Sequence, residues 1–285
     1  MATFGRQSLV EDGAGNVWTA TRRGKKGDVV VGDVVHARPS TAGLARIESV
    51  GPRTSLLFRA DAFRTKELAA NIDLVLVVYA ARPTFNRWFV WKSLVAAHAA
   101  GIESVVIQNK TDLDEDGEAA AFRESLERLG VTTLAVSAKA DPGRTRSALT
   151  ATTRGRDGLL VGQSGMGKST LLNLLVPDAG ARTQEFSQRL DLGKQTTTAS
   201  RRFALPLGGS IVDTPGFQEF GLAHVPLDEL ALSLPEFRPA LGQCRFLDCR
   251  HLAEPDCAVR ALVDRGAVAA DRYAFYRSLA EARHP

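Results

Sequence analysis

Cysteine is scarce in this chain of 285 residues, and its placement excludes a fold held together by disulfides. Only three cysteines occur, all between residues 244 and 257, whereas a disulfide framework needs pairs spread along the chain. Long apolar runs are also missing. The longest covers residues 74–81, which is 8 residues, far fewer than the roughly 20 that a helix needs to span a bilayer. We therefore expect a reducing environment and no membrane association.

The beginning of the chain, residues 1–30, lacks the apolar core of a signal peptide, because polar residues, glycines and basic residues alternate there. The overall composition, 44% hydrophobic and 24% charged, is that of an ordinary soluble globular protein. These features together predict a cytoplasmic protein. Nothing in the sequence indicates more than a monomer.

Positive charge is concentrated at the beginning of the chain. Residues 1–66 hold 11 Lys and Arg against 6 Asp and Glu, a balance of +5, so the rest of the chain sums to −1 within the net charge of +4. A small basic module on a near-neutral body suggests a polyanion partner such as nucleic acid. The alternative is an ordinary solvated face that carries charge without binding anything.

The same N-terminal segment has the pattern of a small all-β barrel. Short strand-like segments alternate with turn signals, at residues 29–31, 34–35, 47–50 and 55–58. Glycines punctuate these segments at positions 13, 15, 24, 27, 43 and 51. Barrels of this kind often bind nucleic acid through one strand face and its loops. The basic run at residues 22–26 would lie on such a loop.

From about residue 67 the sequence changes to alternating strands and helices. Residues 72–80 form a near-continuous apolar strand, as expected where helices cover both faces of a parallel sheet. A helix is predicted over residues 85–100, and further strands are predicted at residues 104–108, 131–136, 158–161 and 210–212. This pattern predicts a doubly wound α/β sheet with its ligand site at the C-terminal ends of the strands.

A phosphate-binding loop follows the strand at residues 158–161 and precedes a helix predicted at 169–175, which is the context that this motif requires. Its glycines let backbone N–H groups close around phosphates. Lys168 would reach the β and γ oxygens, and Ser169 would offer its hydroxyl to Mg²⁺. The predicted phosphate-binding residues are Gly162, Gln163, Ser164, Gly165, Met166, Gly167, Lys168, Ser169 and Thr170.

A second motif, at the end of the strand over residues 104–108, predicts the choice of base. The carboxylate of Asp112 can accept hydrogen bonds from N1–H and the exocyclic amine of guanine, a pair of donors that adenine does not offer. A Ser-Ala-Lys segment, which also follows a strand, would support the guanine edge with backbone groups. The predicted guanine-binding residues are Asn109, Lys110, Thr111, Asp112, Ser137, Ala138 and Lys139.

A third motif, Asp213-Thr-Pro-Gly216, supplies an acid for the Mg²⁺ shell and a glycine whose N–H can contact the γ-phosphate. Between it and the phosphate loop lie three threonines, where a switch threonine would ligate Mg²⁺ in the GTP state. The sequence does not choose among them. They are Thr196, Thr197 and Thr198.

Phe217 follows the third motif, at the position where many GTPases carry a glutamine that orients the attacking water. A hydrophobic side chain cannot orient water, so we expect slow intrinsic hydrolysis that a partner accelerates; catalytic groups supplied in trans contribute roughly 10³–10⁵ in rate. Gln195 and Gln218 are the candidates in this chain to position the water.

The C-terminal part of the chain contains a cluster with metal-ligand spacing. It uses every cysteine in the chain, as Cys244-x4-Cys249-x-His251-x5-Cys257. Three thiolates and one imidazole suit tetrahedral Zn²⁺ with no open position, which predicts a structural site. The alternative is three reduced thiols beside an unrelated histidine. Six arginines surround the cluster and suggest a second polyanion surface: Arg245, Arg250, Arg260, Arg265, Arg272 and Arg277.

The order of the nucleotide motifs is unusual, because the base motif precedes the phosphate loop. With the N-terminal barrel and the Cys-Cys-His-Cys cluster, this permuted order resembles the bacterial ribosome small-subunit-dependent GTPase A family over essentially the whole chain. The resemblance rests on residues 161–171, 213–217, 248–251 and 254–258. It implies an OB-fold barrel over residues 1–66, a circularly permuted GTPase domain over 67–222 and a mostly helical zinc domain over 223–285.

The resemblance also implies a function: late assembly of the 30S subunit, contacts with 16S rRNA, and GTP hydrolysis stimulated by the subunit. One position departs from the family pattern, because Gln195 stands where the family carries a histidine suspected of helping catalysis. Two other classes of function remain open. The chain could be an RNA-docking zinc protein in which GTP is mainly structural, or a signalling GTPase that acts on protein partners.

Overall fold

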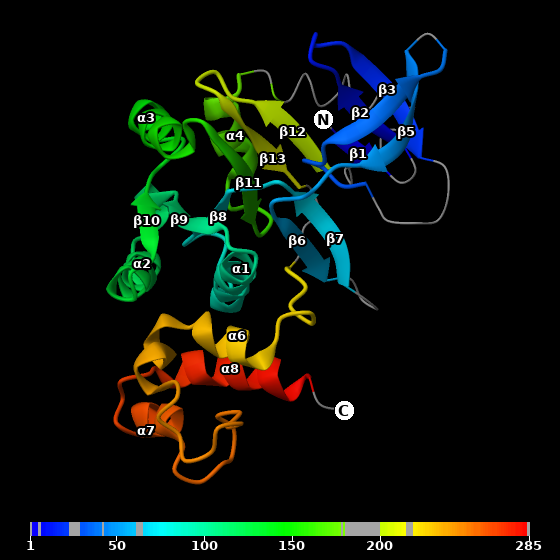
Figure 1. Cartoon of the computed structure of the whole chain (residues 1–285). Helices are drawn as coiled ribbons and strands as arrows, with labels where there is room; N and C mark the ends of the chain where they lie inside the picture. Colours follow the sequence, from blue (N-terminus) through cyan, green and yellow to red (C-terminus); the bar gives the residue numbers. More distant parts are fainter. Residues whose placement is uncertain are drawn as a thin grey trace.

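The structure is a computed structural model that describes residues 2–4, 7–22, 29–41, 43–60, 65–177, 179, 200–214 and 219–283. Its elements form three parts: strands at the N-terminus, a central sheet covered by helices, and a small helical unit at the C-terminus (Figure 1). The predicted threonines Thr196, Thr197 and Thr198, the candidates Gln195 and Gln218, and Gly216 and Phe217 lie outside the described residues.

The central part is built on parallel strands. In spatial order they are β10 (Thr132–Ala135), β9 (Glu103–Asn109), β8 (Leu74–Ala80), β11 (Arg156–Gly162) and β13 (Gly209–Asp213), with β12 (Ser200–Ala204) antiparallel beside β13. Helices α3 (Pro142–Thr153) and α4 (Lys168–Leu175) pack together on one face, and α1 (Arg87–Ala99) and α2 (Glu118–Arg128) lie on the other (Figure 1). This is the doubly wound α/β arrangement expected from the sequence.

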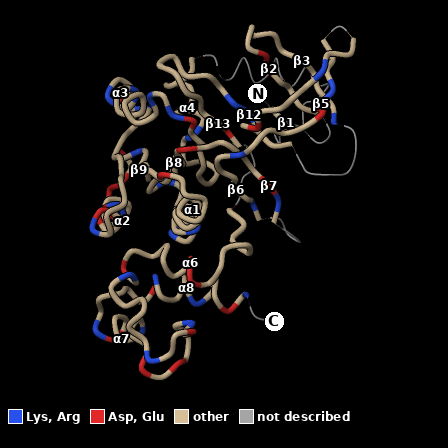
Figure 2. Tube along the Cα trace, in the orientation of Figure 1, with Lys and Arg blue, Asp and Glu red and all other residues tan. Residues whose placement is uncertain are grey.

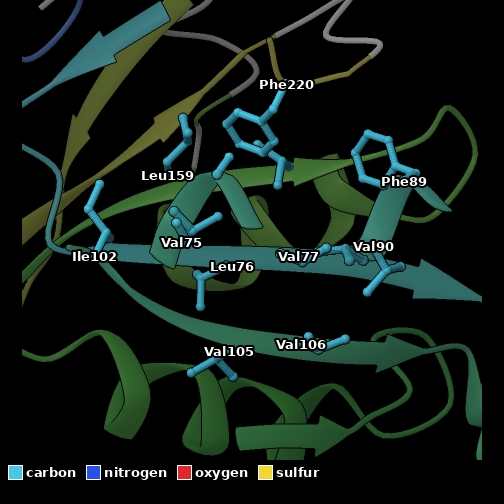
Figure 3. Packing of buried hydrophobic residues seen from close by; sticks show 14 of the residues in the cluster. Val75, Leu76, Val77, Phe89, Val90, Ile102, Val105, Val106, Leu159 and Phe220 are labelled. Carbon is cyan, nitrogen blue, oxygen red and sulfur yellow. The ribbon is translucent and has the colours of Figure 1, made fainter. Parts of the chain in front are cut away.

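The core explains why β8 carries a continuous apolar sequence. All seven of its side chains are buried, because β9 and β11 flank the strand and α1 packs against it. Figure 3 shows Val75, Leu76 and Val77 of β8 among apolar side chains from neighbouring elements. A strand buried on both faces is expected to carry a near-continuous run of apolar side chains.

The N-terminal strands join the central sheet through one pairing. Strand β1 (Ala2–Phe4) pairs antiparallel with β12, with Ala2 opposite Arg201. The sheet therefore continues through β2 (Gln7–Glu11), β3 (Val17–Arg22), β5 (Leu44–Val50) and β4 (Val35–Pro39) into one sheet of 11 strands. The expected strand at residues 29–31 is wrong: Val31 makes only an isolated bridge to Ala69.

A separate hairpin connects the N-terminal strands to the central part. It consists of β6 (Leu56–Ala60) and β7 (Thr65–Ala70), so the predicted domain boundary after residue 66 falls inside β7. Residues 219–221 extend this hairpin, because Ala60 N–H donates to the carbonyl of Glu219 and Gly221 N–H donates to the carbonyl of Phe58. The chain that follows the Asp213 motif is thus fixed against the hairpin.

The C-terminal unit is mostly helical, as expected. It contains α6 (Leu227–Leu232), the 3₁₀ segment η2 (Pro235–Ala240), α7 (Ala258–Asp264) and α8 (Ala270–Glu281). Helix α1 lies between this unit and the central sheet (Figure 1). Among the described residues no helix combines the length and the apolar character needed to cross a membrane.

Candidate nucleotide site and metal centre

The three nucleotide motifs converge at one edge of the central sheet. Asn109 ends β9, Gly162 ends β11 and Asp213 ends β13. Because these strands are parallel, their C-terminal ends meet at the same edge. Residues that are far apart in the chain thereby come within hydrogen-bonding distance.

Asn109 holds three loops together. Its Nδ2 donates to the carbonyl of Met166 at 2.9 Å, and its Oδ1 accepts from the backbone N–H of Ala138 at 3.1 Å. The side chain is 1% exposed, so both of its polar ends are satisfied inside the protein. The predicted phosphate loop, base loop and Ser-Ala-Lys loop are therefore fixed relative to one another by one amide.

Lys110 makes a second connection across the site. Its Nζ donates to the carbonyl of Gly165 at 2.6 Å and to that of Arg82 at 2.9 Å. The residue has a left-handed backbone, with φ of 57°, which turns the chain sharply at the end of β9. The aliphatic part of Lys110 then lies along the phosphate loop, where it can form one wall for a flat base.

Asp112 lies in the short 3₁₀ segment η1 (Thr111–Leu113) and keeps one oxygen without a described partner. Ser137 Oγ donates to its Oδ1, and Ser137 itself is buried. Thr111 N–H donates to the carbonyl of Val136 at 3.2 Å, which fixes the segment against the third loop. The hydrogen bond from Ser137 thus fixes the orientation of the carboxylate, and Lys139 is exposed.

The phosphate loop has the local geometry that anion binding requires. Gly165 and Gly167 have φ of 80° and 92°, and α4 begins immediately afterwards at Lys168. The backbone N–H groups at the start of α4 and the helix dipole both favour an anion at this point. Ser169 and Thr170 follow in the first turn of the same helix.

Lys168 lies folded into the loop. Its Nζ donates to the carbonyls of Gly162 at 2.6 Å and Gln163 at 2.9 Å. Burial lowers the pKa of Lys168, while the negative charge of Asp213 opposes that effect. For Asp213, burial raises the pKa, and the positive charges of Lys168 and Arg201 lower it. A phosphate would give this half-buried ammonium the compensating charge that the protein supplies only partly.

The Cys-His cluster forms a compact group at the C-terminal unit. Ligand atoms of Cys244, Cys249, His251 and Cys257 all lie within 4.8 Å of one another. His251 Nδ1 is 3.5 Å from the sulfurs of Cys244 and Cys257, and those two sulfurs are 4.0 Å apart. The edges of a tetrahedron around Zn²⁺, with bonds of about 2.3 Å to sulfur and 2.0–2.1 Å to nitrogen, are about 3.5–3.8 Å long. The four residues fit a tetrahedral metal ion.

Comparison with known proteins shows to which family the chain is related. The RsgA GTPase family model matches residues 50–223. The chain belongs to the RsgA GTPase family. A small ribosomal subunit biogenesis GTPase RsgA from Paraburkholderia xenovorans is 43% identical over 286 residues, covering 98% of this chain and 90% of the relative. The protein of the same name from Bordetella pertussis is 45% identical over 278 residues, covering 97% of this chain and 92% of the relative.

Solved structures agree with this family. The crystal structure of YjeQ from Thermotoga maritima superposes with a TM-score of 0.71 at 28% identity, covering 97% of this chain and 94% of that one. YloQ, described as a circularly permuted GTPase, has the same fold, with a TM-score of 0.69 at 24% identity and coverage of 99% and 94%. The predicted fold class and GTP-hydrolysing activity are therefore confirmed for this RsgA-family chain.

Two residues that contact the candidate site were missed in the sequence analysis. Arg201 is 6% exposed and lies opposite Asp213 in the β12–β13 register, which brings a second cation to that carboxylate. Asn86, at the N-terminus of α1, donates its backbone N–H to Oε1 of Gln163 at 2.8 Å. No motif in the sequence indicates either residue. The position of Arg201 depends on strand register, and the contact of Asn86 depends on how α1 packs against the phosphate loop.

The structure gives little support to the second polyanion surface predicted around the cluster, which stays a prediction. Five of the six arginines already have partners within the protein: Arg245 pairs with Asp256, Arg272 with Glu236 and Arg277 with Glu281, while Arg250 and Arg260 donate to the carbonyls of Ala280 and Glu254. Arg272 is also buried. Acidic and basic residues alternate through this unit in Figure 2. A surface of mixed charge has no strong attraction for a polyanion.

Proposed function

We propose that this RsgA-family GTPase binds the small ribosomal subunit and its 16S rRNA and hydrolyses GTP during late maturation of that subunit. The observation that carries the proposal is the identity of 43% and 45% over nearly the whole chain with proteins named small ribosomal subunit biogenesis GTPase RsgA. Intrinsic hydrolysis is expected to be slow, because Phe217 follows the Asp213 motif, and the subunit is expected to accelerate it.

The site residues have the following proposed roles. Gly162 to Thr170 hold the phosphates, with Lys168 released from its loop carbonyls to contact the β and γ oxygens. Asp112 accepts the two guanine donors while Ser137 orients it, and Asn109 maintains the spacing between base and phosphate loops. The hydrogen bonds among these loops support this assignment, because they set one fixed distance between the two ends of a nucleotide.

Two metal ions are proposed. Mg²⁺ would be held by Ser169, by one of the threonines at 196–198 and, through water, by Asp213; it would neutralise charge that develops on the phosphates. The closeness of the half-buried carboxylate of Asp213 to half-buried Lys168 and buried Arg201 supports a site arranged for charged ligands. The ion at Cys244, Cys249, His251 and Cys257 is proposed to be Zn²⁺, because thiolate-rich tetrahedral sets favour it.

We further propose three domains, over residues 1–66, 67–222 and 223–285, with the hairpin of β6 and β7 spanning the first boundary, and an RNA contact through the basic first domain. A cytoplasmic location, a monomeric state and the role of Gln195 in positioning water stay predictions. The alternative function, an RNA-docking zinc protein in which GTP is mainly structural, stays open.

Steady-state GTP hydrolysis with purified 30S subunits tests the proposed function, with 50S subunits as the control. We expect strong stimulation by 30S alone. Equal rates with and without 30S would contradict the proposal. Lys168→Ala then distinguishes the proposed function from the alternative. If the nucleotide is a switch, binding of the variant to 30S should no longer respond to GTP. If GTP is mainly structural, binding of the variant to 30S should equal that of wild type.

A further inference from the structure

A groove about 470 Å³ in volume lies beside the metal cluster, outside the nucleotide site. It is formed between α6 and the loop at residues 241–251 that carries three of the four ligands. Its lining includes three large apolar side chains that face solvent: Leu232 is 47% exposed, Phe246 41% and Leu247 fully exposed. These are three of the seven exposed large hydrophobic residues in the described part of the chain.

The position of these side chains distinguishes them from scattered surface apolar residues. Single exposed hydrophobic residues are ordinary, but several gathered on one concave surface mark an interaction site. Phe246 and Leu247 lie between Cys244 and Cys249, so a bound metal ion would hold the loop that presents them. Arg245 stacks over the Phe246 ring at 5.6 Å and is ion-paired with Asp256, which limits the freedom of that ring.

Charge at the groove selects among partners. Asp228 and Asp248 line it, both exposed, and neither is ion-paired to another described residue. Arg250 is the basic lining residue, but its guanidinium donates to the carbonyl of Ala280 at 3.4 Å and is partly buried. Two unpaired carboxylates beside apolar side chains repel phosphate and attract Lys or Arg. The groove therefore suits a polypeptide better than RNA.

We propose that this groove docks a basic, amphipathic segment of a small-subunit protein, with apolar side chains against Leu232, Phe246 and Leu247 and basic side chains beside Asp228 and Asp248. The identity of the partner rests on the proposed ribosomal function, whereas the chemistry of the groove does not. Such a segment would bind as an amphipathic helix does in a groove, with its apolar face against the groove and its cations on either side of that face. The C-terminal unit would then contact protein, while the basic N-terminal strands contact RNA.

The first experiment compares two targets, intact 30S subunits and protein-free 16S rRNA, with a non-hydrolysable GTP analogue present. The double variant Leu232→Ser, Leu247→Ser removes two anchors that face solvent, so the fold should be kept. We expect about tenfold weaker binding to 30S or more, and unchanged binding to 16S rRNA. Leu207→Ser is the matched control, because Leu207 is 52% exposed at a different surface.

Charge reversal tests the acidic rim independently. Asp228→Lys should weaken 30S binding severalfold, whereas Asp264→Lys, an exposed acid of the same unit outside the groove, should have no effect. All variants should keep wild-type metal content and basal GTP hydrolysis. Equal weakening on 30S and on protein-free rRNA would assign the groove to RNA, and no weakening on either target would remove it as a docking surface; both results overturn the proposal.

A synthetic peptide separates a failure of the groove from a failure of the ribosomal function. The probe is a fluorescent peptide, Leu-Lys-Lys-Leu-Leu-Lys-Leu repeated twice, with a counterpart that carries Glu in place of Lys. We expect the basic peptide to bind the full chain, the acidic one not to bind, and the double variant to bind the basic peptide about tenfold more weakly. If wild type binds the peptide but not 30S, the proposed function fails while the groove stands. Equal binding of the basic peptide by wild type and the double variant overturns the groove itself.

Discussion

At the scale of single residues, the geometry of the nucleotide site depends on a few positions where substitution is sterically excluded. Gly167 has φ of 92°, and a Cβ built on it would lie 2.3 Å from Nδ2 of Asn109. The atom that it would displace is the one that fixes the phosphate loop to the base loop. One missing side chain therefore permits the contact on which the spacing of the site depends.

Gly167→Ala should weaken the affinity for a fluorescent GTP analogue by about tenfold or more, because small displacements of binding groups have large effects on ligand geometry. The control is Gly155→Ala, which shares the left-handed backbone, with φ of 68°, but has open space around the added Cβ. It should cost roughly 1–2 kcal/mol of stability from backbone strain alone and keep the affinity. Equal affinity in both variants would contradict the steric argument.

Two histidines should make stability fall in mild acid. Partial burial lowers the pKa of His98 and of His224, whose ring is 4.3 Å from that of Phe58. The folded state thus binds these protons less readily than the unfolded state, so stability is lost as pH falls through about 6.5. Because both side chains keep contact with solvent, the effect should be a few degrees in Tm. The double variant His98→Gln, His224→Gln should show a smaller fall in Tm between about pH 7 and 5 than wild type; a fall equal to that of wild type would contradict this account.

At the scale of elements, α1 connects the nucleotide site to the C-terminal unit. The backbone N–H of Asn86 at its N-terminus donates to Gln163 of the phosphate loop. Helix α1 also packs on α8, because the rings of Trp88 and Trp91 contact the ring of Phe275, with centroids 5.6 and 5.4 Å apart. Arg272 of α8 lies over the Trp91 ring at 4.8 Å. Aromatic and cationic contacts of this kind fix an interface more specifically than aliphatic packing alone.

Arg272→Ala should lower the free energy of unfolding by about 3–5 kcal/mol, because it leaves the carboxylate of Glu236 buried without its partner. The side chains of the pair are 10% and 6% exposed, and Oε2 of Glu236 already has no hydrogen-bond partner among the described residues. Arg277→Ala on the same helix breaks an exposed pair with Glu281 and should leave the free energy of unfolding almost unchanged, because solvent screens exposed ion pairs. Urea unfolding of the two variants measures both values, and similar costs would contradict the importance of burial.

Particular residues show what could be predicted from the sequence. The phosphate loop and the base motif could be proposed from the sequence because each is a continuous stretch whose chemistry needs residues at fixed spacing. Three other features could not be predicted, because each depends on register or packing between distant segments. They are the position of Arg201, the contact of Gln163 with Asn86, and the groove beside the metal cluster. The ion pair of Arg272 was missed for the same reason: its acidic partner, Glu236, is far away in sequence. The strand expected at 29–31 failed because the chain there makes one bridge rather than a ladder.

At the scale of the whole molecule, the contacts form a continuous route from the phosphate loop through α1 to the groove-bearing C-terminal unit. Gln163→Ala removes the hydrogen bond to Asn86 while leaving the backbone of the loop intact. We expect GTP affinity to change little and the preference of 30S binding for the GTP form over the GDP form to fall. A nucleotide shifts such an equilibrium only through differential affinity for two states. Measuring 30S binding with each nucleotide tests this, and an unchanged preference would exclude the route through Asn86.

The pairing of Ala2 with Arg201 has a consequence for synthesis of the protein. A ribosome adds about 5–20 residues per second. Strand β12, which pairs with the edge of β1 that is not paired with β2, is therefore translated roughly 10–40 seconds after β1. The permuted order delays the nucleotide site in the same way: the base-reading loop emerges before the phosphate loop, and Asp213 emerges after both. A site that uses all three predicted motifs is therefore not complete until about three-quarters of the chain has been made.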